Sequence, residues 1–218
     1  MKMWMGIFNK IETKKYKSKT NITDKMFDTI WNEIKNNNIL GYDNSKILFN
    51  ELIDCVDMSG NTAEIGVYEG NISIMIKIAI PDKCHYCYDT FCGITNAQSC
   101  DYHRDGEFSC NLESVKKNIN SKNVIYRVGY FPDTFLELNK TFNFVYSDTA
   151  TYNGAKNTFL MFCSRMVGGG KIVFYVDENC KGVELAIQEF IEREDGIDGF
   201  NIYRKSRFII FTKKIIMN

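Results

Sequence analysis

Short apolar runs alternate with amphipathic segments along most of the sequence, and this alternation limits the folds open to the chain. From residue 63 onward, predicted strands are followed by predicted helices, and the last two strands are separated by only a few residues. Repeated strand–helix units pack as a parallel sheet with helices on both faces. Two strands joined by a short connection run antiparallel. The pattern therefore predicts a Rossmann-like α/β fold whose mostly parallel, seven-stranded sheet has an antiparallel edge strand.

The predicted strands span residues 63–67, 84–88, 124–128, 142–146, 171–176, 201–203 and 207–212, and the predicted helices between them span residues 72–80, 112–119, 157–166 and 183–193. Two further helices are expected before residue 63. The first follows Thr23 and has apolar residues at helical spacing, namely Phe27, Ile30, Trp31 and Ile34; the second covers 45–58. We therefore expect residues 1–58 to form an N-terminal helical extension or cap, and residues 59–218 the Rossmann-like domain.

Charge and hydropathy exclude several classes of partner. The chain has 27 basic and 27 acidic residues, whereas proteins that bind nucleic acid usually carry a basic excess. It has neither an 18-residue apolar stretch nor a segment typical of a signal peptide. We expect no nucleic-acid partner, no membrane partner and a cytoplasmic location. The aromatic-rich N-terminus offers a surface for a homodimer, and the oligomeric state stays open.

Five of the eight cysteines lie close together in the sequence with a histidine, at Cys84, Cys87, Cys92, Cys100, His103 and Cys110. Cys84-x2-Cys87 and Cys100-x2-His103 have the spacing of zinc ligands. Residues 84–88 are a predicted strand, however, and residues three apart on a strand point to opposite faces. We therefore expect reduced, mostly buried thiols rather than a zinc site.

Candidate ligand-binding residues lie at the ends of the first two predicted strands, at the edge where doubly wound sheets bind their ligands. Gly66 and Gly70 allow a tight turn and a close approach of the backbone to a ligand, and Glu64 precedes them. Asp89 follows the second strand, where an acid can accept both ribose hydroxyls of an adenosine cofactor. The alternative is structural: the glycines form only a turn, and Asp89 caps the loop after it.

A series of short motifs occurs in a fixed order along about residues 60–190: AEIGVYEG at 63–70, DTFCG at 89–93, GEF at 106–108, GYFPDT at 129–134, DTATY at 148–152 and GG at 169–170. This series resembles the macrocin O-methyltransferase family, whose members methylate sugar hydroxyls on antibiotics and related glycosides. The resemblance implies the class I methyltransferase fold, S-adenosylmethionine as cofactor and a Mg²⁺ ion that holds the substrate hydroxyls. It also implies that the cofactor is bound by Glu64, Gly66, Tyr68, Gly70, Asp89 and Asp148.

The sequence departs from the family pattern at the metal ligands. Asp148 matches the first metal-binding acid, but Ala150 stands where the family has the second. The family's paired acids align with Tyr175 and Val176 of this sequence, and the nearest acids, Asp177 and Glu178, come two residues later. Either a β-bulge brings these two acids into place and Asp148, Asp177 and Glu178 hold Mg²⁺, or the metal site is dismantled, because Asp148 alone would hold the ion weakly.

Methyl transfer to a hydroxyl requires alignment of the reacting atoms and removal of the hydroxyl proton. Asp148 is the expected catalytic residue because it follows the fourth strand at the carboxyl edge of the sheet. His103 is the alternative base, while Tyr130 and Tyr152 are expected to line the pocket.

The sequence therefore predicts an S-adenosylmethionine-dependent O-methyltransferase that acts on a hydroxyl of a small-molecule sugar or glycoside. Two alternatives stay open. One is a catalytically degenerate binding protein that keeps the fold. The other is a methyltransferase for another acceptor class, such as nucleic acid or protein; residues 147–150 lack the N/D-P-P-Y/F motif that amino-methylating nucleic-acid enzymes carry at this place.

Overall fold

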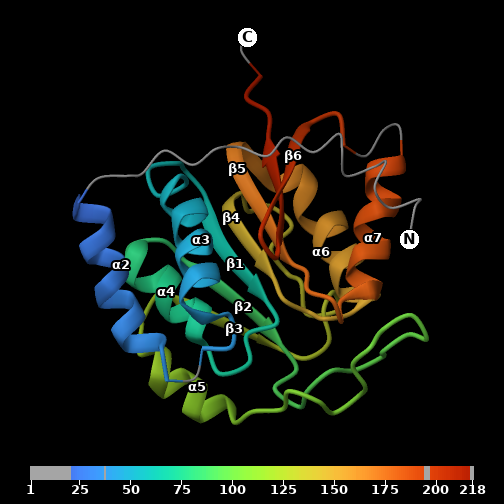
Figure 1. The fold of residues 1–218 in the computed structure, drawn as a ribbon, viewed down its shortest axis with the longest axis horizontal. Coiled ribbons are helices and arrows are strands. Elements are labelled where there is room, and N and C mark those ends of the chain that lie inside the picture. Colours follow the sequence, from blue (N-terminus) through green and yellow to red (C-terminus); the bar gives the residue numbers. More distant parts are fainter. Residues whose placement is uncertain (1–20, 37, 194–196, 217–218) are drawn as a thin grey trace.

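The computed structural model describes residues 21–36, 38–193 and 197–216. Seven strands form one sheet in the order β3-β2-β1-β4-β5-β7-β6 (Figure 1). The strands are β1 (Asn61–Ile65), β2 (His85–Asp89), β3 (Val124–Val128), β4 (Phe142–Ser147), β5 (Met166–Tyr175), β6 (Phe200–Lys205) and β7 (Phe208–Lys213). Neighbouring strands from β3 to β5 are parallel, and β7 runs antiparallel to both β5 and β6. The predicted mostly parallel, seven-stranded sheet is confirmed.

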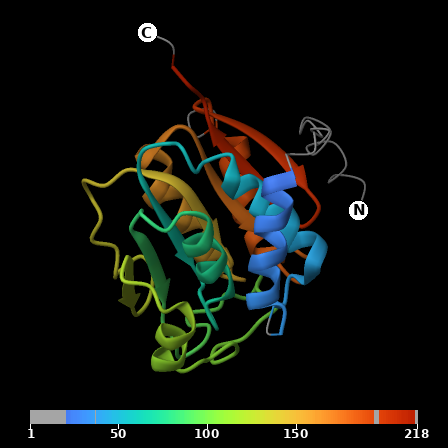
Figure 2. The same ribbon diagram turned by 90° about the vertical axis from the view of Figure 1, so that its left-hand side faces the viewer.

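The helices are α2 (Asn21–Ile34), α3 (Gly41–Ile53), α4 (Asn71–Ala79), α5 (Leu112–Ile119), α6 (Tyr152–Phe162) and α7 (Lys181–Glu192), with a short 3₁₀ helix η1 (Cys163–Arg165). From β1 the chain moves outward to β2 and β3, and then returns to build β4 and β5 on the other side. Right-handed crossovers in opposite directions place helices on opposite faces. Thus α4 and α5 cover one face and α6 and α7 the other, with the sheet between them (Figures 1 and 2).

Several element boundaries differ from those predicted. The predicted helix over 157–166 begins earlier, at Tyr152, because the Thr151 side chain caps it by accepting a hydrogen bond from the Gly154 N–H at 3.2 Å. The predicted helix over 45–58 begins at Gly41 and ends at Ile53. Local hydrogen bonds decide such ends, and they leave little trace in the hydrophobic pattern.

The two N-terminal helices share the apolar core of the sheet. Phe27 on α2 and Phe49 on α3 are fully buried in the same cluster as Phe144 on β4 and Phe190 on α7. The division of the chain at residue 58 stays a prediction, since residues 1–20 lie outside the described part of the chain. None of the described helices has the length and hydropathy that crossing a bilayer requires.

A buried charged cluster centred on Glu51 fixes α3 against the sheet. The Glu51 carboxylate accepts hydrogen bonds from Lys171 Nζ at 2.6 Å, Tyr203 Oη at 2.6 Å and Lys205 Nζ at 2.8 Å. Lys171 Nζ also contacts Asp54 at 2.7 Å. Removing one partner of such a cluster leaves an uncompensated buried charge, so these bonds hold α3 in one position over β5 and β6.

Candidate active site

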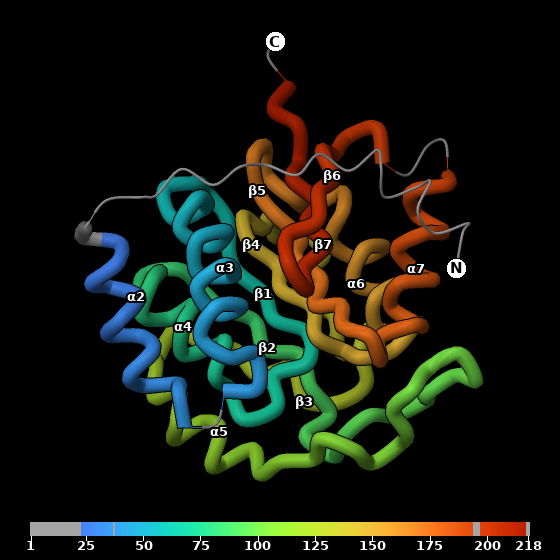
Figure 3. The backbone as a smooth tube through the Cα atoms, in the orientation of Figure 1, coloured from blue at the N-terminus to red at the C-terminus, as the bar shows by residue number. Residues whose placement is uncertain are grey.

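A cavity of about 380 Å³ opens at the carboxyl ends of β1, β2, β4 and β5. The order of strands reverses between β1 and β4, and doubly wound sheets bind ligands beside such a reversal. Residues 38–40 between α2 and α3 and residues 129–131 after β3 contribute to the wall. Most of it is formed by loops that follow the four strands, among them the long loop between β2 and α5. Figure 3 follows that loop, the green tube between β2 and α5, toward the lower ends of α6 and α7.

Gly66 is required by the neighbouring backbone. Its φ is +85°, and a Cβ atom built there would lie 2.8 Å from the Asp148 carbonyl carbon and closer still to the carbonyl oxygen. The Asp148 N–H donates to the Ile65 carbonyl at 2.8 Å, so the loops after β1 and β4 are in direct contact. The obstruction to a larger residue at position 66 therefore lies in the protein itself.

Gly70 lies outside the set of described residues that line the cavity. It is the N-cap of α4 with φ +86°, and a Cβ atom there would lie 3.0 Å from Ile119 Cδ1 and 3.1 Å from Val115 Cγ1. Gly70 therefore allows α4 to approach α5, and the structure does not place it at the predicted cofactor site. Glu64, Gly66, Tyr68, Asp89 and Asp148 do line the cavity.

Asp89 stabilises the loop after β1, residues 66–70, which we call the glycine loop. Its Oδ2 accepts hydrogen bonds from the N–H groups of Val67 at 2.7 Å and Tyr68 at 2.9 Å, and its Oδ1 accepts one from Phe91 N–H at 2.7 Å. A carboxylate offers about four acceptor positions, so one position on Oδ1 is left for a ligand. Asp89 can accept one ribose hydroxyl with the loop in place, rather than the two that the sequence indicated.

We expect Asp89→Ala to weaken S-adenosylmethionine binding at least roughly tenfold. Loss of one charge-assisted hydrogen bond costs about 1.5–3 kcal/mol, and the variant also frees the N–H groups of the glycine loop. Isothermal calorimetry measures the affinity, with Glu113→Gln as the control because Glu113 is an exposed carboxylate on α5. Unchanged affinity in Asp89→Ala would rule out a ribose contact.

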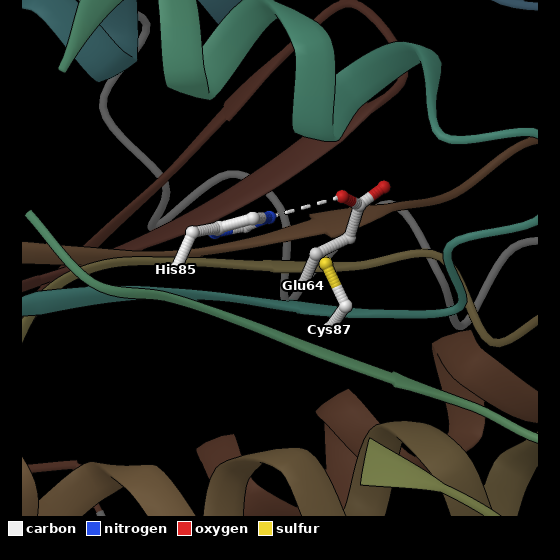
Figure 4. Close-up of side chains that lie close together, drawn as sticks. All are labelled: Glu64, His85 and Cys87. Atoms are coloured by element: carbon white, nitrogen blue, oxygen red, sulfur yellow. Dashed lines mark ion pairs between the residues drawn. The ribbon is translucent and has the colours of Figure 1, made fainter. Parts of the chain in front are cut away.

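Glu64 belongs to a fully buried polar network beneath the cavity. Ser73 Oγ donates to Glu64 Oε2 and lies 3.1 Å from His85 Nε2 and 3.3 Å from Cys87 Sγ. Figure 4 shows His85 and Glu64 pointing toward each other, with Nε2 and Oε2 3.4 Å apart. Burial raises the pKa of Glu64 well above its usual value and lowers the pKa of His85 to about 3. His85 is therefore neutral at pH 7, and the contact is not an ion pair.

Glu64, His85 and Cys87 bring three metal-ligand atoms within 4.8 Å of one another, the only such group among the described residues. The Ser73 hydroxyl already contacts all three side chains and satisfies them. We interpret the group as a structural network that fixes β1 and β2 against α4. The zinc-like spacing of Cys84 with Cys87 and of Cys100 with His103 does not form a ligand set in the described chain, and all eight cysteines are free thiols.

Asp148 lies directly after β4 on the cavity wall. Tyr146 Oη donates to Asp148 Oδ2 at 3.1 Å. Burial raises the pKa of Asp148 to about 6, and the neighbouring charge of Asp177 acts in the same direction, whereas the Tyr146 hydrogen bond opposes it. Asp148 is therefore mostly ionised at pH 7 and is the acid best placed to accept a hydrogen bond from a bound hydroxyl.

The described acids do not fit a Mg²⁺ site. Asp177 lines the cavity, but its Oδ1 accepts hydrogen bonds from Asn179 N–H at 2.9 Å and Cys180 Sγ at 3.3 Å within its own turn. Glu178 is exposed and lies outside the lining. With Ala150 at the remaining position, two carboxylates stand where an octahedral ion needs several oxygen ligands. The proposed metal role of Asp148, Asp177 and Glu178 is not supported by this arrangement.

We therefore expect EDTA to leave the rate of methyl transfer unchanged, and Asp177→Asn to change this rate very little. The asparagine keeps an oxygen that can accept the Asn179 N–H, so the turn after β5 is retained. Initial rates with EDTA, and after addition of excess Mg²⁺, measure the effect. Turnover that stops with EDTA and returns with Mg²⁺ would contradict this expectation and restore the three-acid site.

The charge of the cavity and two unpaired polar atoms suit S-adenosylmethionine. Besides the buried Glu64, four acids line the wall, against one arginine, Arg207, which favours a cationic ligand. Thr149 Oγ1 and Asn38 Nδ2 are buried without a hydrogen-bond partner among the described residues, and both residues line the cavity. Such buried polar atoms need a partner, and the carboxylate and hydroxyls of the cofactor can supply one. The sequence patterns did not point to either residue.

Of the two tyrosines that were expected to line the pocket, one lies on the cavity wall and the other does not. Tyr130 lines the cavity. Tyr152 is outside the described lining, because its Oη donates to Glu189 on α7 at 2.7 Å.

Solved structures of methyltransferases resemble this chain in fold. The O-methyltransferase NovP is 19% identical with a TM-score of 0.65, covering 77% of this chain and 80% of NovP. CalS11, a calicheamicin methyltransferase, is 14% identical with a TM-score of 0.63, covering 92% and 98%. The O-methyltransferase TomG from Streptomyces achromogenes is 14% identical with a TM-score of 0.56, covering 91% and 92%.

The chain has the Rossmann-like methyltransferase fold. No protein-family model matches the sequence, and no curated protein matches it. The identities to the solved structures are low, so the likeness concerns the fold alone.

Proposed function

We propose that this chain is an S-adenosylmethionine-dependent O-methyltransferase of the macrocin type, acting on a hydroxyl group of a small-molecule sugar or glycoside. The observation that carries the proposal is the acidic cavity at the strand reversal of a methyltransferase fold, with Asp148 on its wall and the Asp89-braced glycine loop at its edge. Structural neighbours support it: TomG is described in complex with S-adenosylmethionine, and CalS11 as a TDP-rhamnose 3'-O-methyltransferase.

Three groups of residues would hold the cofactor. The loop after β1 presents backbone at Gly66 and Tyr68, and Asp89 offers one acceptor position to a ribose hydroxyl. Asn38 Nδ2 and Thr149 Oγ1 are unpaired polar atoms for its other groups. When bound, S-adenosylmethionine supplies a methyl group already activated by the positive sulfur.

The chain then has to orient the acceptor and exclude water. Asp148, ionised at pH 7, accepts a hydrogen bond from a hydroxyl next to the reacting one, and so turns the reacting oxygen toward the methyl donor. Apolar residues such as Ile94 and Phe131 line the same cavity and limit the access of water. The equal numbers of basic and acidic residues favour a small-molecule acceptor over nucleic acid.

The test is a methyl-transfer assay with radiolabelled S-adenosylmethionine against a panel of glycosides and nucleotide sugars, with nucleic acid and protein acceptors as separate arms. Label in a glycoside or nucleotide sugar supports the proposal. Label in nucleic acid or protein would assign another acceptor class. Cofactor binding without transfer to any acceptor would point to a degenerate binding protein.

A further inference from the structure

The long loop between β2 and α5 is held over the cavity by residues other than its histidine. Asp101 is buried, and its Oδ1 accepts a hydrogen bond from Tyr152 N–H at the start of α6 at 2.8 Å. Its Oδ2 accepts one from Gln98 N–H at 2.8 Å. Backbone hydrogen bonds between Ile94 and both Gly106 and Glu107 close the base of the loop. The fold of this loop therefore does not depend on the His103 side chain.

His103 is nevertheless held in one orientation at the cavity wall. Its Nδ1 lies 2.7 Å from Glu107 Oε2, and its ring makes edge contacts with Tyr102 and Phe108 at centroid distances of 5.2 and 4.9 Å. His103 lines the cavity, whereas Glu107 lies outside the described lining. The other ring nitrogen, Nε2, has no hydrogen-bond partner among the described residues.

Glu107 determines which ring nitrogen carries the proton. The hydrogen bond from His103 and the Arg104 N–H, which donates to Glu107 Oε1 at 3.0 Å, hold the pKa of Glu107 below its usual value. Glu107 is thus a carboxylate at pH 7, an acceptor only. Neutral His103 must place its proton on Nδ1 to donate to it, which leaves a lone pair on Nε2.

We propose that His103 is the general base of the methyl transfer and that Glu107 is its positioning residue. The inference rests on the proposed O-methyltransferase function. As the acceptor oxygen bonds to the methyl carbon and the carbon–sulfur electron pair returns to sulfur, the hydroxyl proton passes to His103 Nε2. The imidazolium that forms is paired with the Glu107 carboxylate and then releases the proton to water. Asp148 accepts a hydrogen bond from a neighbouring hydroxyl of the sugar and so holds the reacting hydroxyl in place.

Solvent access favours His103 over Asp148 as the proton acceptor. The side chains of His103 and Glu107 are 18% and 45% exposed, so a proton taken from the cavity has a path to water. Asp148 is half-buried and already accepts a hydrogen bond from the Tyr146 hydroxyl. A positive charge on His103 also stabilises the ionised Asp148 electrostatically, although burial and Asp177 outweigh this effect and raise the pKa of Asp148.

The first experiment observes the tautomer directly and does not require activity. The chain has only two histidines, so ¹⁵N-histidine labelling gives spectra of two rings. His85, whose pKa burial lowers to about 3, is the internal control that stays neutral. We expect the neutral form of His103 to carry its proton on Nδ1 and to lose this preference in Glu107→Gln, with His85 unchanged. The assignment of His103 as the base would be overturned if neutral wild-type His103 carried its proton on Nε2, or if its tautomer did not change in Glu107→Gln.

The second experiment measures turnover and chemical rescue. We expect His103→Ala to lose roughly 10²–10⁴-fold in kcat with cofactor affinity retained, and imidazole in solution to restore part of the rate. Asp148→Asn should not respond to imidazole. Glu107→Gln should lower kcat about tenfold without raising KM, because the neutral amide no longer stabilises the imidazolium. Glu113→Gln, the exposed carboxylate on α5, serves as the matched control.

The outcomes separate this inference from the proposed function. Full activity in His103→Ala, or a loss that imidazole does not reduce, rejects the base assignment while wild-type turnover upholds the methyltransferase. A wild-type protein that neither binds S-adenosylmethionine nor transfers methyl groups rejects the proposed function itself, and the His103 tautomer then decides whether the His103–Glu107 pair exists as described.

Discussion

Replacing Asp148 by asparagine is expected to lower turnover by about 10²–10⁴-fold while S-adenosylmethionine binding is retained. The carboxylate accepts a hydrogen bond from the hydroxyl next to the reacting one, which turns the reacting oxygen toward the methyl group, whereas the amide presents a donor on one side and carries no charge. The geometry around it is preserved, because the asparagine oxygen can still accept the Tyr146 hydroxyl. Initial-rate kinetics and calorimetry on the same preparation separate the two effects. A fully active Asp148→Asn enzyme would contradict every role given to Asp148.

The pH dependence gives a second measurement on the same residue. Burial raises the pKa of Asp148 to about 6, so the wild-type rate should fall as the pH drops through about 6 and Asp148 takes up a proton. A carboxyl whose pKa is raised by folding favours the fold when protonated and destabilises it when ionised. At pH 7, Asp148→Asn should therefore be at least as stable as the wild type. A variant that melts lower at pH 7 would mean that the lost turnover reflects unfolding.

The hydrophobic pattern of the sequence was sufficient to predict the sheet but not to predict the chemistry of the cavity. Period and length of apolar runs predicted all seven strands, since strands buried on both faces read as continuous apolar segments. One part of the site could also have been predicted. Tyr146 and Asp148 stand two residues apart at the end of β4, as do Tyr175 and Asp177 at the end of β5, and residues two apart on a strand share a face.

The rest of the site depends on contacts between segments far apart in the sequence. Whether Asp89 has one or two acceptor positions left is decided by the backbone of residues 67 and 68. Asn38, whose Nδ2 has no hydrogen-bond partner among the described residues, reaches the cavity wall because it lies in the loop before α3. Glu178 was an equal candidate to Asp177 in the sequence, and only the course of the turn after β5 separates the exposed acid from the one at the cavity.

Gly66→Ala is expected to abolish measurable cofactor binding and also to destabilise the fold. The added Cβ would lie within 2.8 Å of the Asp148 carbonyl carbon, at a φ of +85° that L-residues rarely adopt. Positive φ and backbone overlap together should cost more than about 3 kcal/mol. Relief requires the loops after β1 and β4 to separate, which displaces Asp148 and the N–H groups held by Asp89 at the same time.

Gly41→Ala is the matched control for this variant. Gly41 has φ +73°, but among the described atoms a Cβ there meets nothing within 4 Å. The control therefore carries the conformational cost of positive φ, about 1–2 kcal/mol, without the overlap. The melting temperature should be highest for the wild type, lower for Gly41→Ala and lowest for Gly66→Ala. Calorimetry should find cofactor binding in the wild type and in Gly41→Ala, but not in Gly66→Ala. If Gly66→Ala binds S-adenosylmethionine as Gly41→Ala does, the contact between the loops after β1 and β4 does not support the cofactor site, and the glycine is only part of a turn.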